Sequence, residues 1–205
     1  MRVIHVEFLV EEPSMEALLR PLLPRLLGAV PFGIRTFQCK NDLLKRLPDR
    51  LRGYTWFPEQ YRIVVVVDRD NDDCQALKQA LERHAAQVGL PTRTHPQKGH
   101  FTVINRIAIE ELEAWYFGDW KAVRAAYPRV SQTVPQRAGY RNPDAILGGT
   151  WEAFERVLQQ SGYFKGGLQK IKAARSIAPH LDPARNTSHS FQVFREALLA
   201  LASET

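Results

Sequence analysis

The sequence of 205 residues has little of what marks secreted, zinc-binding or membrane proteins. It contains two cysteines, Cys39 and Cys74, which are too few for a disulfide framework and too widely spaced for a metal knuckle. No apolar run is long enough to cross a bilayer, so no membrane partner is expected. The first apolar stretch is interrupted by His5 and Glu7 and lacks a small-residue cleavage site, unlike a signal peptide. These absences predict a cytoplasmic protein.

The sequence also lacks internal repeats, low-complexity tracts and an ATP-binding loop. No Gly-x-x-x-x-Gly-Lys-Ser/Thr motif occurs, so any ATPase has to be supplied by another chain. The net charge of +6 is unevenly placed, because residues 1–118 carry 16 Lys+Arg against 15 Asp+Glu and residues 119–205 carry 12 against 7. A basic C-terminal part suits a polyanionic partner such as nucleic acid, although it is equally compatible with a simple solubility feature.

Hydrophobic patterning predicts an α/β fold with a mostly parallel, Rossmann-like sheet flanked by helices. Ser14 and Asn41 are the expected N-caps of the first two helices, and Pro21 and Pro24 are expected to kink or split the first. Strand patterns occur at residues 2–10, 34–39, 63–67, 91–95 and 103–109, with helix patterns at 15–28, 41–51 and 75–88.

The strand signals stop beyond residue 119, where a loop-rich stretch is followed by three helix patterns near residues 151–160, 168–178 and 190–202. We therefore expect an α/β core over residues 1–118. Residues 119–205 are expected to form a helical C-terminal extension packed on that core.

One stretch departs from an ordinary α/β pattern. Five β-branched residues, Ile63 to Val67, predict a strand buried on both faces, and four aspartates follow within six positions: Asp68, Asp70, Asp72 and Asp73. Carboxylates crowded in this way repel one another unless something positive lies among them. At the carboxyl edge of a parallel sheet, a divalent cation is the expected partner.

Two further acidic clusters follow predicted strands, Glu11-Glu12 and Glu110-Glu111-Leu112-Glu113. Because the carboxyl ends of parallel strands share one edge of a sheet, the three clusters are expected to converge. Oxygen ligands select Mg²⁺ or Mn²⁺, and such an ion can polarise a phosphoryl oxygen. The simpler interpretation is that Asp70, Asp72 and Asp73 cap the next helix, that Glu11 is a solvated loop acid, and that the glutamates of the third cluster complement a helix dipole.

The first two clusters resemble the motifs of Toprim domains, the metal-binding catalytic domains of topoisomerases, primases and overcoming-lysogenization-defect (OLD) nucleases. Val10-Glu11-Glu12-Pro13-Ser14 is similar to the Toprim Glu-Gly-x-Ser/Thr turn, with Glu12 in place of glycine, and Asp68-Arg69-Asp70 to its Asp-x-Asp. The resemblance implies that Glu11 is the general acid/base and that Asp68 and Asp70 hold the metal, supplemented by Asp72 or Asp73. Glu111 and Glu113 would face the same edge as ligands or as anchors for the C-terminal helices.

The whole chain also resembles a bacterial Toprim-like family of unknown function, often encoded beside ABC-type ATPases in defence-like gene pairs. The stretches that carry this resemblance are Glu111 to Trp115, Tyr163 to Lys165 and Ser188 to Phe191. It implies a Mg²⁺-dependent nuclease acting on DNA or RNA in antiviral defence. The alternative is a non-catalytic or conditionally active partner subunit of an ATPase-containing defence complex.

Basic residues are the candidates for holding the phosphates of a nucleic acid. For each of them taken alone, a solvated basic face is the simpler interpretation. The predicted phosphate-binding residues are Lys98, His100, Lys165 and Lys170.

Overall fold

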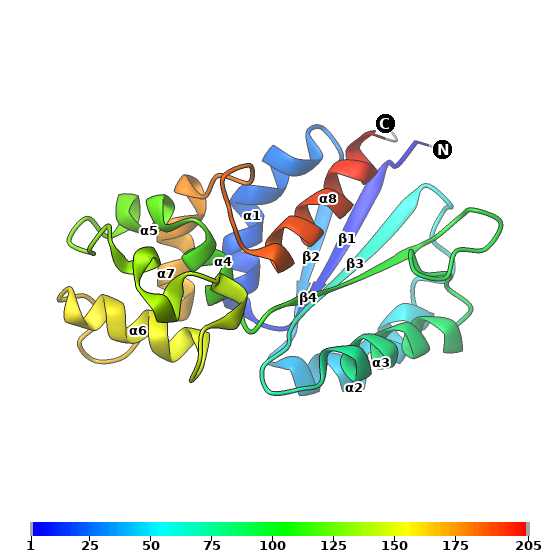
Figure 1. The fold of residues 1–205 in the computed structure, drawn as a ribbon. Coiled ribbons are helices and arrows are strands. Elements are labelled where there is room, and N and C mark those ends of the chain that lie inside the picture. Colours follow the sequence, from blue (N-terminus) through cyan, green and yellow to red (C-terminus); the bar gives the residue numbers. More distant parts are fainter. Residues whose placement is uncertain (1, 204–205) are drawn as a thin grey trace.

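The computed structural model describes residues 2–203, and its centre is a four-stranded sheet (Figure 1). The strands are β1 (His5–Val10), β2 (Phe32–Thr36), β3 (Tyr61–Asp68) and β4 (Val103–Ala108), in the spatial order β2-β1-β3-β4. All three pairings are parallel, so the carboxyl ends of the strands lie along one edge. The α/β class with a parallel sheet, predicted from the sequence, is confirmed.

Helices connect the strands and make up most of the chain after β4. Within the described residues, no helix has the length and apolar character that a membrane span requires. The α-helices are α1 (Pro13–Leu27), α2 (Lys40–Arg52), α3 (Cys74–Gln87), α4 (Glu113–Gly118), α5 (Trp120–Ala126), α6 (Thr150–Gln160), α7 (Lys170–Ile177) and α8 (His189–Ser203). Short 3-10 turns are η1 (Val134–Gln136), η2 (Ala138–Tyr140), η3 (Pro143–Ala145) and η4 (Ala178–His180).

The sheet is buried on both faces. Along β3, Val64 and Val66 belong to a hydrophobic cluster on one face, whereas Ile63, Val65 and Val67 belong to a cluster on the other. This alternation is the two-residue period of a strand, and branched side chains pack well on a pleated surface. Helices α1 and α8 cover the first face and α2 and α3 the second (Figure 1).

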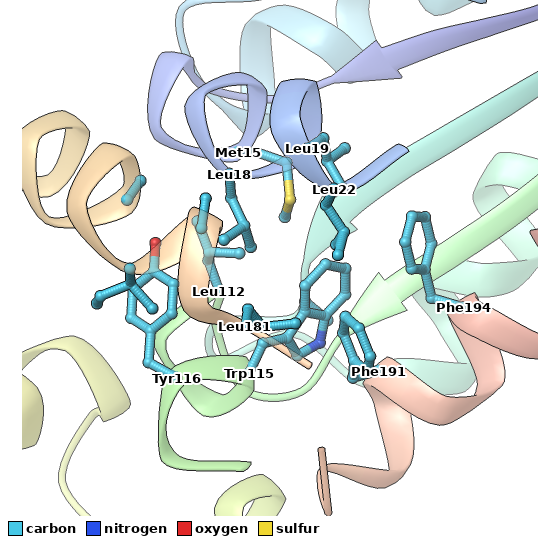
Figure 2. Packing of buried hydrophobic residues seen from close by; sticks show 14 of the residues in the cluster. Met15, Leu18, Leu19, Leu22, Leu112, Trp115, Tyr116, Leu181, Phe191 and Phe194 are labelled. Atoms are coloured by element: carbon cyan, nitrogen blue, oxygen red, sulfur yellow. The ribbon is translucent and has the colours of Figure 1, made fainter. Parts of the chain in front are cut away.

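The remaining helices, α4 to α7, stand together beyond the carboxyl ends of the strands (Figure 1). The hydrophobic core runs without a break from α1 into this group and on to α8. Trp115 of α4 is its centre, with ring centroids 5.2 Å from Phe191 and 5.1 Å from Phe194, both on α8 (Figure 2). The indole N–H of Trp115 also donates to Ser190 Oγ at 3.1 Å. The C-terminal helices therefore share one core with the sheet.

Helix α1 is continuous, although we expected Pro21 and Pro24 to kink or split it. Both prolines lie on its exposed side, where carbonyls that lose their helical partner can be hydrated. The opposite side is held by six buried leucines, Leu18, Leu19, Leu22, Leu23, Leu26 and Leu27.

Three local expectations were wrong. Ser14 lies inside the first turn of α1 and Glu12 takes the cap position, because Pro13 already suits the first helical residue. Asn41 lies inside α2, which begins one residue earlier. The segment at 91–95 makes a single bridge, Thr92 with Val103, instead of a strand.

The shared core gives a first prediction. Replacing Phe191 with alanine removes a fully buried ring that touches Trp115 and Phe194. We expect the free energy of unfolding, measured by urea denaturation, to fall by about 3–5 kcal/mol in a single transition. Leu199→Ala, on the exposed side of the same helix, is the matched control and should change it by less than about 0.5 kcal/mol. Similar small losses for both variants would contradict a core that includes α8.

Candidate active site at the carboxyl edge of the sheet

Glu11 and Asp68 meet where two neighbouring strands end. Val10 at the end of β1 is in register with Val66 of β3, so the residues that follow lie side by side. The Oε2 atom of Glu11 accepts a hydrogen bond from the backbone N–H of Asp68 at 2.9 Å. Both side chains are almost inaccessible, since Glu11 is 6% exposed and Asp68 is 2% exposed. The sequence-based pairing of these two acids is therefore present in the structure.

Glu113 adds a third buried acid from the start of α4. It is 0% exposed, and neither of its carboxylate oxygens has a hydrogen-bond partner. The Oδ1 atom of Asp68 is likewise buried and unpartnered. Leaving buried polar atoms unsatisfied costs free energy, so native proteins rarely keep them without a functional reason.

The pKa values of all three acids are raised above the ordinary values of their side chains. Burial raises the pKa of Glu11 to about 7, reinforced by the negative charges of Asp70 and Glu12 and opposed by the Asp68 N–H. Burial also raises the pKa of Glu113 to about 7, against the opposing charge of Lys170. The pKa of Asp68 is raised well above its usual value by burial, by Glu11 and by Glu113. Glu11 and Glu113 can therefore exchange protons near neutral pH.

Lys170, the first residue of α7, is the cation that faces these acids. Burial would lower its pKa, but the carboxylates of Glu113, Glu12, Asp68 and Glu111 outweigh burial and raise it. Its ammonium group also lies 5.6 Å from the ring centroid of Trp151. This charge balances part of the acidic cluster without making a direct ion pair with it.

Asp70 and Asp72 are neutralised by a lysine that the sequence analysis missed. Lys40 Nζ lies 2.5 Å from Asp70 Oδ2 and 2.7 Å from Asp72 Oδ2, and it donates to the carbonyl of Arg69 at 3.0 Å. The two aspartate side chains are 42% and 51% exposed, unlike the buried acids. Lys40 is the first residue of α2 and follows shortly after the end of β2. A lysine beyond the carboxyl end of a parallel strand is the sequence signal by which it could have been found.

The remaining acids of the predicted clusters have structural partners. Asp73 caps α3, because its Oδ1 accepts from the Ala76 N–H at 2.7 Å, as the capping interpretation predicted. Glu111 Oε2 accepts from the Trp151 N–H at 2.8 Å and from Thr150 Oγ1 at 3.1 Å. Glu111 therefore anchors the start of α6, which is one of the two roles expected for it.

The predicted phosphate-binding residues are scattered. Lys98 and His100 precede β4, so the strand separates them from the carboxyl edge on which the acids lie. Lys165 is exposed in the loop between α6 and α7 and lines a depression with Tyr127 and Tyr163. Of the four predicted residues, Lys170 is the one that the structure brings to the acidic site.

The donor set fits a hard cation bound in the manner of magnesium. Among residues 2–203, no group of three histidine, cysteine, aspartate or glutamate side chains is arranged to hold a metal by itself. Mg²⁺, however, commonly takes one or two carboxylates and completes its shell with water and substrate phosphates. The three unpartnered oxygens of Asp68 and Glu113 suit that mode, and these two residues would hold the ion.

Comparison with known proteins agrees with this architecture. Residues 10–199 match the family described as Domain of unknown function (DUF4276). The structure is similar to the C-terminal region of the Burkholderia pseudomallei OLD protein, with a TM-score of 0.57 at 13% sequence identity, over 98% of this chain and 100% of that one. The C-terminal region of the Xanthomonas campestris pv. campestris OLD protein gives a TM-score of 0.51 at 13% identity, over 98% and 94%. No curated protein matches the sequence.

The raised pKa of Glu113 predicts how stability depends on pH. Between its ordinary pKa of 4.5 and about 7, the folded protein retains a proton that the unfolded chain loses, so stability falls as pH rises through this window. Glu113→Gln removes that loss. The difference in the free energy of unfolding, variant minus wild type, should therefore increase by up to about 3 kcal/mol as pH rises through the window.

Urea denaturation at several pH values measures this difference. Glu196→Gln, an exposed position on α8, is the control and should follow the wild-type profile. A Glu113→Gln profile parallel to wild type would show that Glu113 titrates normally.

Proposed function

The chain belongs to the DUF4276 family and shares its fold with the C-terminal regions of OLD proteins, and from this premise we propose that it is a Toprim-like, metal-dependent nuclease. The reaction would be hydrolysis of phosphodiester bonds in DNA or RNA. The observation that carries the proposal is the convergence of three buried acids, Glu11, Asp68 and Glu113, at one edge of the sheet, where Asp68 and Glu113 carry carboxylate oxygens without hydrogen-bond partners.

The acids divide into distinct roles. Asp68 and Glu113 would hold Mg²⁺ or Mn²⁺, which when bound polarises a phosphoryl oxygen and acidifies bound water. Glu11 would act as the general acid/base, because a carboxyl with a pKa of about 7 can accept or donate a proton near neutral pH. Its hydrogen bond to the Asp68 N–H fixes its position. Asp70 and Asp72, held by Lys40, shape the rim of the site.

A basic surface beside the acids suits a polyanionic substrate. Helix α7 begins with Lys170 and Lys172 and has no acid in its first turn, although cations at a helix N-terminus oppose the helix dipole. Arg175 of α7 and Arg20 of α1 line a groove of about 530 Å³ between these two helices. A nucleic-acid backbone lying along this surface would account for the unfavourable placement of the lysines.

The second candidate is a conditionally active subunit, and the burial of the site favours it. A substrate cannot reach Asp68 and Glu113 while both are almost fully covered, so the helices around them would have to move. An ABC-type ATPase acting in trans would supply that movement, since the chain has no ATP-binding loop of its own. Antiviral defence would be the setting for such a pair.

Isosteric substitution of the acids tests the proposal. Glu11→Gln should lower Mg²⁺- or Mn²⁺-dependent cleavage of plasmid DNA or RNA by about 10²- to 10⁴-fold, as expected for loss of a general acid/base. Asp68→Asn and Glu113→Gln should abolish cleavage, because each removes a metal-binding oxygen. Circular dichroism would verify that each variant remains folded.

Glu196→Gln is the matched control, because this exposed acid on α8 lies outside the acidic site and its loss should leave cleavage close to wild type. Each reaction is run with and without a candidate ABC-type ATPase partner. Cleavage only when the ATPase is present assigns the conditional form. Undiminished cleavage by Asp68→Asn would rule out this site as the active site.

Substrate binding by α7 can be measured separately from cleavage. In a chain carrying Glu11→Gln, we expect Lys170→Gln or Lys172→Gln to reduce the slope of log affinity against log salt by about 1, because each contact to a phosphate releases about one counterion. Fluorescence anisotropy with a labelled oligonucleotide gives this slope. Lys121→Gln, an exposed site on α5, is the control and should leave it unchanged. Equal slopes for all variants would exclude α7 from the interface.

A further inference from the structure

A groove of about 610 Å³ lies along the outer edge of β4, apart from the acidic site. Its floor is β4 itself, and its walls include Lys78 of α3 and Val193 of α8. None of its lining residues belongs to the buried acidic cluster. Volumes of this size are typical of pockets for small organic ligands.

The edge of β4 offers free backbone donors to this groove. Even-numbered residues of β4 pair with β3, as the bond from the Arg69 N–H to the Ala108 carbonyl shows, so odd-numbered residues point outward. Val103 is capped by the segment at 91–93, and the Ile109 N–H donates to Ser190 Oγ at 3.2 Å. Between these capped ends, the N–H groups of Asn105 and Ile107 face the groove, and no described residue accepts from them.

Arg106 supplies a positive charge that no carboxylate of the described residues neutralises, although its Nη1 donates to the Asn105 carbonyl at 2.8 Å. Its Nε atom is buried without a hydrogen-bond partner, and within the described residues its guanidinium forms no ion pair. Lys78, by contrast, is already paired with Glu82 at 3.1 Å. The acid in the groove, Asp144, is committed as well, because its carboxylate accepts from Ser188, Ser190 and the His189 N–H at the start of α8. An anion entering the groove would therefore meet Arg106 as a cation without a carboxylate partner and with an unpartnered Nε.

The groove is not built to receive an added β-strand. The outward carbonyl of Asn105, which an added strand would need as an acceptor, is occupied by Lys78 Nζ at 2.9 Å and by Arg106 Nη1 at 2.8 Å. Lysine and other charges on an edge strand are a recognised means of blocking strand addition. Donors thus remain free while this acceptor is capped, which favours an anion.

We infer that this groove is a binding site for the phosphate group of a nucleotide. Arg106 and the N–H groups of Asn105 and Ile107 would hold the phosphate. Ile107, Ile109 and Val193 provide an apolar surface for the remainder of the ligand, and the buried, unpartnered Oδ1 of Asn105 would accept from a hydroxyl or amino group. The site is independent of the metal-dependent chemistry proposed above.

Isothermal titration calorimetry of the full chain in EDTA tests the inference without any metal-dependent cleavage. AMP should bind saturably, and adenosine, which lacks the phosphate, much more weakly. Arg106→Gln should weaken AMP binding by about 10- to 100-fold, the usual effect of removing a charge-assisted hydrogen bond. Lys121→Gln is the matched control for loss of one positive charge and should bind as wild type.

Val193→Trp is a second variant, which keeps the inference testable if Arg106→Gln fails to fold. The tryptophan fills the groove from α8 without altering its charge, so it should abolish AMP binding. The affinity for a 5′-phosphorylated dinucleotide distinguishes two sources of the phosphate. Tighter binding than that of AMP indicates the end of a nucleic-acid strand as the ligand, and weaker binding indicates a free nucleotide. Equal affinity for AMP and adenosine, or wild-type binding by both groove variants, would overturn the inference, as would the absence of any binding.

Discussion

The burial of Asp68 and Glu113 without hydrogen-bond partners for three of their carboxylate oxygens is the constraint on which the rest of the structure depends. Charges in such surroundings are costly unless they are protonated or neutralised. Two features of the molecule reduce this cost. The pKa values of Glu11 and Glu113 are raised to about 7, so both can remain protonated, and Lys170 faces the cluster. A bound divalent cation would also neutralise the carboxylates, and it would connect this unfavourable arrangement to catalysis.

The helical part of the chain maintains that burial. Trp115 packs α4 against α8, and α8 in turn lies on the sheet, so the helix that carries Glu113 is held from both sides. Glu111, two residues earlier, anchors α6 by accepting from the Trp151 N–H and the Thr150 hydroxyl, and so helps to close the site. The features that stabilise the fold are therefore the same ones that limit access to the acids.

The pairing of Glu11 with Asp68 followed from strand direction, because all strands of a parallel sheet end at one edge whatever their order is. The assignment of Asp70 and Asp72 as metal ligands did not anticipate Lys40, which comes from a different connection and neutralises them. A run of acids indicates only that a positive partner is needed, and a lysine satisfies that need as well as a metal ion does.

The sequence by itself determined the α/β class, the buried strand at residues 63–67 and the edge at which acids gather, because these follow from local periodicity and from the direction of parallel strands. Only the tertiary structure decided which acids are buried and unpartnered, which are capped or paired, and that Lys170 from the distant α7 faces them. Burial and electrostatic pairing depend on packing between segments far apart in the chain. No local pattern around Glu113 distinguishes it from Glu111, yet one is an unpartnered buried acid and the other anchors a helix.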